Sequence, residues 1–517
     1  MGLRDKIFIR SLALVYFLAF SSLAFQVIGL VGAHGILPVS GLLQNIKSQT
    51  VNLSQCLNIL PTIFWFNSSD SFLKISCYLG IIGSILLFTK LKSSQRLGLV
   101  FLLFVLYLSF VNIGQVFFGF QWDVLLLETG FLTMLYCFFY RYEFARPIFI
   151  FLYRFLVFKL MFMSGLVKLT SQDPNWANLE ALNYHYLTQP LPNPLSFFVH
   201  QLGSGFHKVS CALMFCIELI VPFFIFINSR LRSFAGLAFI LLQLIIMLTG
   251  NYCFFNILVV ALCVWLFDEN TLIKFIPKTS IKLKFFKTPL DILNFKINER
   301  LSRMGIISDN LWQKFYKIIL RLVLVFILAY YILVNIFIII SRAPISETQR
   351  LIAFQQYSKL SQPIERFHII NPYGLFAVMT TVRHEIIIQG AKHIPGELAP
   401  GNWQDYEFYW KPGDPSKSPQ QVAPYQPRLD WQMWFAALSN YQEQAWFINF
   451  CIRLLENKPE VLKLIQHNPF PDQAPDYLRA IVYEYKFNNL ENYSKTGMVW
   501  TRELKGFYLQ PTHLQKD

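Results

Sequence analysis

Apolar runs of membrane-spanning length constrain the fold of this chain more than any other feature of its sequence. A helix crosses the ~30 Å hydrocarbon core of a bilayer with about 20 consecutive apolar residues, and several runs here reach that length. The composition agrees, because 54% of the 517 residues are hydrophobic and only 15% are charged. We therefore predict a polytopic α-helical membrane protein of about nine spans. They cover residues 7–33, 72–89, 97–118, 124–139, 147–169, 209–228, 233–248, 252–267 and 318–340.

The loops between these spans carry a charge pattern that predicts the orientation of the chain. The formal net charge is +15, and the basic residues concentrate in loops 90–96, 140–146, 229–232 and 268–317. Because Lys and Arg are enriched in cytosolic loops, we expect these loops and the N-terminus to be cytosolic. The basic excess then indicates topology and contact with anionic membrane lipids, and it argues against nucleic acid as a partner.

This orientation divides the chain into two parts. Residues 1–340 form a transmembrane domain with outer loops at 34–71 and 170–208 and a basic cytosolic loop at 268–317. Residues 341–517 contain no further span, and nine spans place them outside the cytosol. We expect them to form a soluble, extracytosolic α+β domain.

Local patterns predict the elements of that C-terminal domain. Asp430 precedes an apolar run and is a candidate N-cap for a buried helix. Further helices are predicted at 443–456 and 459–466. β-branched and apolar residues between turn residues predict strands at 376–379 and 385–389, and alternation of apolar and polar residues predicts strands at 406–410, 479–487 and 500–510.

Three features of processing follow from short motifs. Residues 22–24 (SLA) resemble a signal-peptidase site, but the first apolar run is longer than a ~7–15-residue signal core, which favours a retained span. The eight cysteines include no CxxC pair, and only Cys56 and Cys451 lie outside the predicted spans, where one disulfide between them is possible. Asn52, Asn67 and Asn492 begin glycosylation sequons on the predicted outer side.

Five charged residues lie within the apolar runs of predicted spans four to six. A charge near the bilayer centre costs ~2.5–3.5 kcal/mol on insertion scales, so it normally faces protein or a wet cavity. One interpretation is that the charges pair inside the bundle and fix helix register. The other is a polar pocket for a substrate or a lipid headgroup. The five residues are Glu128, Arg154, Lys159, Lys168 and Glu218.

The loop after predicted span five is a second candidate site. Prolines at 190, 192 and 194 hold it extended, and polar and aromatic side chains precede them. Candidate residues here are Tyr184, His185, Tyr186 and Gln189. Histidines at 185, 200 and 207 lack the spacing of a metal-binding helix face, and the chain has no GxSxG, GxGxxG or Walker sequence. We therefore predict no catalytic residue, metal or cofactor, and consider an enzyme the less favoured class.

Aromatic residues of the C-terminal part form a third candidate site. Tryptophan, tyrosine and arginine are enriched where proteins bind partners, although a Trp-rich domain core gives the same composition. The residues that we predict to bind a client protein are Tyr425, Arg428, Asp430, Trp431 and Trp434.

Several segments resemble the lipase maturation factor family. They include 122–131 (WDVLLLETGF), 164–169 (SGLVKL), 188–194 (TQPLPNP), 371–376 (NPYGLF) and 423–438 (APYQPRLDWQMWFAAL), within a resemblance that spans about residues 95–515. The resemblance implies a polytopic membrane protein that assists folding and assembly of secreted lipases, with a lumenal C-terminal domain that contacts the client. The membrane would be that of the endoplasmic reticulum in a eukaryote, or the inner membrane in a bacterium.

Three positions depart from the family pattern as the resemblance presents it. Lys159 stands in place of Arg, Leu187 in place of Glu and Tyr425 in place of His. An alternative function, an intramembrane enzyme or a lipid-handling protein, would use the polar residues of spans four to six.

Overall fold

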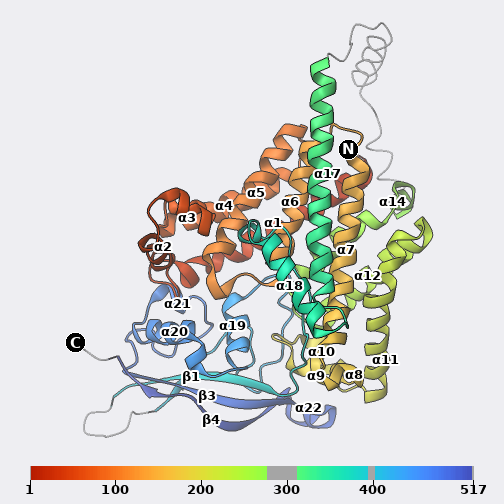
Figure 1. The fold of residues 1–517 in the computed structure, drawn as a ribbon. Helices are drawn as coiled ribbons and strands as arrows, with labels where there is room; N and C mark the ends of the chain where they lie inside the picture. The colour runs from red at the N-terminus through yellow and green to blue at the C-terminus, as the bar shows by residue number, and fades with distance from the viewer. Residues whose placement is uncertain (1, 276–310, 394–401, 515–517) are drawn as a thin grey trace.

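In the computed structural model, long helices stand side by side and a β-sheet lies across one end of them (Figure 1). The structure describes residues 2–275, 311–393 and 402–514. Among these residues, eight helical segments are long and apolar enough to cross a membrane, which confirms a multi-span helical fold. They are α1 (Leu3–Val31), α4 (Asp70–Leu87), α5 (Ser93–Ile113), α6 (Gln121–Phe139), α7 (Ala145–Thr170), the run Ser204–Phe226, α12 (Ser229–Thr249) and α17 (Leu311–Ile340).

The predicted span 252–267 is shorter than a full membrane helix. It comprises α13 (Phe255–Cys263) and η5 (Val264–Leu266), about 18 Å of helix at 1.5 Å per residue. Asn251 before it binds the C-terminal part, whereas Glu269 after it pairs with Arg146 at the other end of the bundle. The segment therefore still runs from one end of the bundle to the other, buried among longer helices.

The run Ser204–Phe226 is not a regular α-helix. Its α-helical part, α11 (Ser204–Phe215), passes into a π-helical turn, η3 (Cys216–Ile220), and then a 3-10 stretch, η4 (Val221–Phe226). Pro222 has no N–H to donate and cannot continue an α-helical ladder, which accounts for the irregular end.

Short helices fill the two predicted outer loops. The first contains α2 (Val39–Ser48), α3 (Leu53–Ile59) and η1 (Ile63–Trp65), and the second contains α8 (Pro174–Ala177), α9 (Ala181–Thr188) and α10 (Pro194–His200). Of the basic loop predicted at 268–317, the structure describes α14 (Glu269–Phe275) and the start of α17. Its residues 276–310 lie outside the described part of the chain.

The C-terminal part combines helices with one antiparallel sheet, as predicted. Its four strands have the order β2-β1-β3-β4, and β1 and β3 pair in a regular register with Ile387 opposite Ile481. The strands are β1 (Arg383–Ala391), β2 (Gln404–Asp405), β3 (Tyr477–Phe487) and β4 (Trp500–Thr512). The helices are α18 (Glu347–Ser361), η6 (Glu365–Phe367), α19 (Arg428–Ala436), η7 (Tyr441–Glu443), α20 (Ala445–Leu455), α21 (Pro459–Leu462) and α22 (Leu490–Thr496).

Two predicted strands and one predicted cap are wrong, for reasons visible in the hydrogen bonds. Residues 376–379 form no strand, because the N–H of Met379 donates to Asp173 in the second outer loop. Most of 406–410 is also irregular. Helix α19 begins at Arg428, so Asp430 lies inside it, where its Oδ1 accepts the N–H groups of Trp410 and Lys411.

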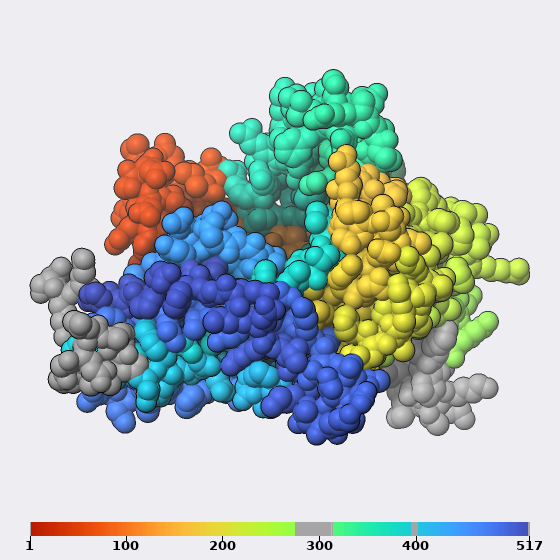
Figure 2. Space-filling model, turned by 90° about the horizontal axis from the view of Figure 1, so that it is seen from below, coloured from red at the N-terminus to blue at the C-terminus, as the bar shows by residue number. Residues whose placement is uncertain are grey.

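The hydrophobic core is continuous between the bundle and the C-terminal part. The rings of Trp122 on α6 and Trp431 on α19 meet edge to face at 4.8 Å, and those of Phe117 and Trp446 meet at 5.7 Å. Seen from below, the C-terminal residues cover much of this end of the molecule beside the second outer loop (Figure 2). The sheet and its helices are therefore packed onto the bundle over an apolar junction.

Candidate functional site at the junction of the bundle and the C-terminal part

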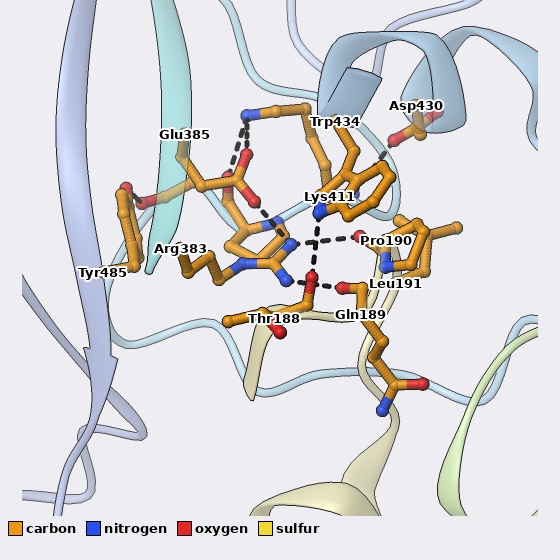
Figure 3. Close-up of polar contacts among 12 residues, drawn as sticks. Thr188, Gln189, Pro190, Leu191, Arg383, Glu385, Lys411, Asp430, Trp434 and Tyr485 are labelled. Atoms are coloured by element: carbon orange, nitrogen blue, oxygen red, sulfur yellow. Dashed lines mark hydrogen bonds and ion pairs between the residues drawn. The ribbon is translucent and has the colours of Figure 1, made fainter. Parts of the chain in front are cut away.

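Arg383, at the start of β1, caps the carbonyl groups of the second outer loop (Figure 3). Its guanidinium donates to the backbone oxygens of Leu187, Gln189 and Pro190 at 2.9, 2.6 and 3.0 Å, and to Glu385 Oε1 at 2.5 Å. The prolines of this loop have no N–H to donate, and its extended shape leaves carbonyls unpaired. A planar guanidinium with several fixed donors can satisfy them together, so Arg383 fixes the loop against the sheet.

Lys411 and Trp434 complete the same contact. The ammonium of Lys411 lies 3.0 Å from Glu385 Oε2, so that carboxylate has a cation on each oxygen. The indole N–H of Trp434 donates to the carbonyl of Thr188 at 2.9 Å. The ionised groups of Arg383, Glu385 and Lys411 are almost fully buried. Two cations share one carboxylate, and further donors of both cations bind backbone carbonyls.

A second buried ion pair joins α19 to α6. Arg428 Nη2 lies 2.9 Å from Asp123 Oδ1, and Nη1 lies 3.1 Å from Oδ2, a two-point contact. Tyr107 also donates to Asp123 at 2.6 Å, and Arg428 stacks over the ring of Phe118 at 3.6 Å. The exposed fraction is 1% for Arg428 and 0% for Asp123, so neither charge has access to solvent.

The loop before α19 is held by two side-chain amides of the bundle, one on α1 and one in the turn between α12 and α13. Asn251 Oδ1 accepts the backbone N–H groups of Val422 and Ala423 at 2.7 and 3.0 Å. Gln26 on α1 donates to the carbonyl of Gln426 at 2.7 Å and accepts the N–H of Arg428 at 2.8 Å. Buried side chains of the bundle therefore form hydrogen bonds with individual backbone groups at this junction.

Glu128 is the centre of a third polar cluster, deep among α6, α7 and α17. Its Oε1 accepts from Lys159 at 2.6 Å and from Tyr331 at 2.5 Å, while Oε2 accepts from Tyr373 at 2.6 Å and Asn371 at 3.2 Å. Tyr373 and Asn371 come from the segment that leads into the sheet. The carboxylate is fully buried and saturated with donors, which leaves it no free lone-pair direction for a ligand.

Lys168 and Glu218 form a separate pair at the irregular part of the sixth long segment. Their charged atoms lie 2.7 Å apart, and Lys168 also faces the ring of Trp176 at 5.6 Å. A Cβ at Gly165 would lie 2.9 Å from the Cβ of Glu218. The glycine thus permits the close approach of α7 and η3 that brings the two charges together.

Arg154 does not join either pair. It donates to the carbonyl of Trp265 at 3.1 Å and lies 3.8 Å from Asp268, near the opposite end of the bundle. The five predicted intramembrane charges therefore occupy three places. An apolar cavity of about 700 Å³ lies among α5, α6 and α17, lined by residues such as Phe101, Met134 and Val323, and none of the five lines it.

The predicted outer-loop residues face the protein. Tyr252 donates to Gln189 Oε1 at 3.1 Å and lies 3.2 Å from His185 Nε2. Burial, and secondarily the charge of Lys168, lower the pKa of His185 to about 4. Tyr186 is buried against His207, and Tyr184 is half-buried. These side chains hold the loop in shape, and their role in binding anything else stays a prediction.

The predicted client-binding residues lie at the junction. Trp431 is 4% exposed and Trp434 is 7% exposed, and Arg428 and Asp430 are also buried. Burial raises the pKa of Asp430 to about 6. Tyr425 packs beside Trp410. Four of these side chains are thus buried in contacts within the chain and Tyr425 is half-buried, and their role in client binding stays a prediction.

Two further features concern possible metal ligands and the cysteines in the described part of the chain. No group of three or more His, Cys, Asp or Glu side chains there is arranged to hold a metal ion. The eight cysteines are free, so Cys56 and Cys451 form no disulfide with each other. Cys451 is buried within α20, and Cys56 lies 3.0 Å from the hydroxyl of Thr50.

Several residues of the junction were not among the predicted site residues. Asp123 and Tyr373 stand inside the segments that carry the family resemblance, which was the available signal for them. Arg383 and Glu385 had a weaker signal, two opposite charges at the start of a buried strand. Nothing local marks Gln26 or Asn251, because their partners lie 402 and 171 residues away in the sequence.

Comparison with known proteins covers both parts of the molecule. The family model described as "Lipase maturation factor transmembrane domain" matches residues 3–274, and that described as "Lipase maturation factor C-terminal domain" matches residues 369–510. Lipase maturation factor 2 of Gallus gallus is 33% identical over 96% of this chain and 80% of its own length. Lipase maturation factor 1 of Homo sapiens is 31% identical over 99% of this chain and 88% of its own.

No solved structure matches the chain. The two family matches together cover most of the sequence, and they include every buried ion pair of the junction described above, whereas α17 and α18 lie between them. The chain therefore belongs to the lipase maturation factor family.

Proposed function

We propose that this protein is a membrane-bound maturation factor that assists the folding of secreted lipases. The observation that carries the proposal is the match to relatives named lipase maturation factors over nearly the whole chain, in both parts. The client is an exported lipase that has not yet reached its native state. The protein acts by binding it, and the endoplasmic reticulum membrane is the site of action that the family implies.

The C-terminal part and the bundle meet this client as one rigid unit. Three buried polar clusters, centred on Arg383, Asp123 and Glu128, tie it to the helices. A factor that holds a folding client gains from a rigid surface, since little ordering free energy is then spent on the factor itself. We infer that the C-terminal part meets the client on the exported side, as the loop charges favour.

The function is tested by replacement. Cells that lack their own lipase maturation factor 1 receive this chain together with a secreted lipase that depends on that factor, and the ratio of secreted lipase activity to secreted lipase mass is measured. We expect the ratio to rise well above that of empty-vector cells. An unchanged ratio, with the chain present in the membrane at normal levels, contradicts the proposal.

The orientation is tested independently with the three sequons. Asn52, Asn67 and Asn492 are all exposed. Asn492 lies on α22, within the C-terminal part. In a eukaryotic host, the chain should carry a glycan that the substitution N492Q removes. A C-terminal part digested by protease from the cytosolic face of sealed microsomes contradicts the proposed orientation.

A further inference from the structure

Away from the junction, strands β3 and β4 carry an exposed apolar and cationic surface on the same side of the sheet as Arg383 and Glu385. Paired residues across the two strands point to the same side, and this side includes the pairs Ile481–Phe507 and Tyr483–Leu504. Leu504 is 60% exposed and Phe507 is 49% exposed. We name this surface the β4 face and define it as Arg479, Tyr483, Arg502, Leu504 and Phe507; Ile481 is buried and is not part of it.

Ring contacts confirm that these side chains lie together. The guanidinium of Arg502 lies over the ring of Tyr483 at 4.6 Å, and that of Arg479 lies over Phe507 at 5.8 Å and over Trp403 at 4.1 Å. Arginine and aromatic residues are the types that contribute most to binding at protein interfaces.

The two arginines lack the partners that other cations of the sheet have. On the opposite side of β4, Lys505 pairs with Glu484 at 2.8 Å and with Glu503 at 3.2 Å. Arg479 donates to Gln389, which in turn binds Asp405, and Arg502 donates to the hydroxyl of Tyr485 and the carbonyl of Gly413. Neither arginine pairs directly with a carboxylate within the described ranges. The β4 face is thus complementary to an acidic side chain.

The backbone of β4 adds a second element of recognition. β4 is the last strand of the sheet, so from Thr501 onward one side of it has no strand partner among the residues described. The N–H of Trp500 donates to Pro415, which closes the edge before that point. Residues 501–505 are all exposed. Soluble proteins usually protect such edges, because an unpaired row of N–H and C=O groups binds any available extended chain.

The position of the edge suits a partner in the exported compartment. β4 lies at the end of the molecule farthest from the N-terminal end of α17 (Figure 1), and the C-terminal residues dominate the view from below (Figure 2). A polypeptide emerging beside the bundle reaches this edge without entering the junction.

We propose that β4 binds an extended segment of the unfolded client by adding it to the sheet. The segment pairs its backbone with residues 501–505, lays apolar side chains on Leu504 and Phe507, and places an acidic side chain at Arg502. This mode gives broad recognition, since backbone pairing supplies affinity and alternate side chains supply a modest preference. The client dissociates when the bound segment joins a β-sheet of the client's own fold, because the backbone groups of that segment are then paired within the client. The inference rests on the proposed function.

A photo-crosslinking residue at Leu504 tests the contact in cells that make this chain and a secreted lipase. The matched control is the same residue at Leu490 on α22, which is 48% exposed but lies off the sheet. We expect lipase to be crosslinked from position 504 and not from 490. Equal crosslinking from both positions, or crosslinking only to a second copy of this chain, overturns the proposal.

Substitution provides the functional arm. The double variant L504K/F507K should lower the secreted lipase activity per mass by roughly tenfold, the size expected when two central interface side chains are lost. L490K should have no effect, and both variants should reach the membrane at the level of the unchanged chain. If the unchanged chain and the L504K/F507K variant support the lipase equally well, the β4 proposal is overturned and the proposed function stands. An unchanged chain that supports no lipase overturns both.

Discussion

Arg428 and Asp123 form a two-point ion pair across 305 residues of sequence, with nitrogen–oxygen distances of 2.9 and 3.1 Å. The pair joins the helix at the centre of the C-terminal part to a helix of the bundle. Both groups are buried, so the contact is worth little compared with a hydrophobic pair but is costly to break on one side only.

The first prediction concerns this pair. The substitution D123N leaves a buried guanidinium without its charge partner and should lower stability by about 3–5 kcal/mol, measured by thermal unfolding in detergent. R428K should also destabilise, because lysine cannot make the two-point contact. The control is K495A, which removes an exposed partner of Glu491 on α22 and should cost less than about 1 kcal/mol. Equal losses for D123N and K495A would contradict the burial argument.

The second prediction separates structure from chemistry at Glu128. E128Q should destabilise the protein strongly, because Lys159 then stays buried and charged with only a neutral partner. The double variant E128L/K159M removes both charges and should recover much of the loss. If the pair served a ligand, the double variant would be stable but inactive in the lipase assay. Full lipase support by a stable E128L/K159M variant would assign the pair to structure alone.

The sequence predicted the architecture well, because membrane spans and buried strands leave long regular signals. Apolar length located the eight long helical segments, and β-branched runs and apolar–polar alternation located β1, β3 and β4. The errors came where backbone groups bond outside regular structure. The sequence of 376–379 is typical of a strand, but the N–H of Met379 donates to Asp173 instead of to a neighbouring strand. The sequence predicts Asp430 as the N-cap of α19, but Pro427 occupies the N-cap position.

The candidate site was predictable only in part. Charges within apolar runs identified the Glu128, Lys159, Lys168 and Glu218 positions, yet only the structure shows that they make two separate pairs. Composition could not distinguish a Trp-rich junction from a binding surface. Of the two tryptophans predicted to bind a client, Trp431 packs on Trp122 and Trp434 donates to Thr188, and their role in client binding stays a prediction. Contacts between residues hundreds of positions apart leave no local pattern.

A third prediction concerns the carbonyl cap of Arg383. R383A removes donors from three buried carbonyls and leaves Glu385 with one cation. Because unpaired buried polar groups cost about 1–3 kcal/mol each, the loss should exceed about 3 kcal/mol. The cleanest readout is protease cutting within residues 187–193, which should become much faster. R479A, on the same sheet but outside the junction, should leave that cutting rate unchanged, and a faster rate there would contradict the assignment.

A fourth prediction concerns Gly374, whose φ is +139°. This conformation is unfavourable for other residues, and a Cβ here would lie 2.7 Å from the side chain of Val167 on α7. G374A should therefore cost more than the ~1–3 kcal/mol of backbone strain alone. The control is G413A, where a Cβ meets open space. Similar melting temperatures for the two variants would show that the segment around Gly374 is not packed tightly against α7.

A fifth prediction concerns acid. His185 has a pKa of about 4 in the folded protein against 6.5 ordinarily, so between these values the unfolded chain binds more protons. Its contribution to stability is complete above pH 6.5 and is lost as the pH falls toward 4. H185Q should flatten the fall of the melting temperature between pH 6.5 and 5. An identical slope in both proteins would show that this ring does not govern the acid response.

The partners of Glu128 have a consequence for synthesis. Tyr373 and Asn371 leave the ribosome only after the last long helix, so every earlier stage of translation holds a bundle with an incompletely matched carboxylate inside it. A polypeptide cut short before residue 371 would keep that defect permanently. Nonsense mutations before codon 371 should therefore lower the amount of protein in the membrane far more than nonsense mutations in the last codons of the gene.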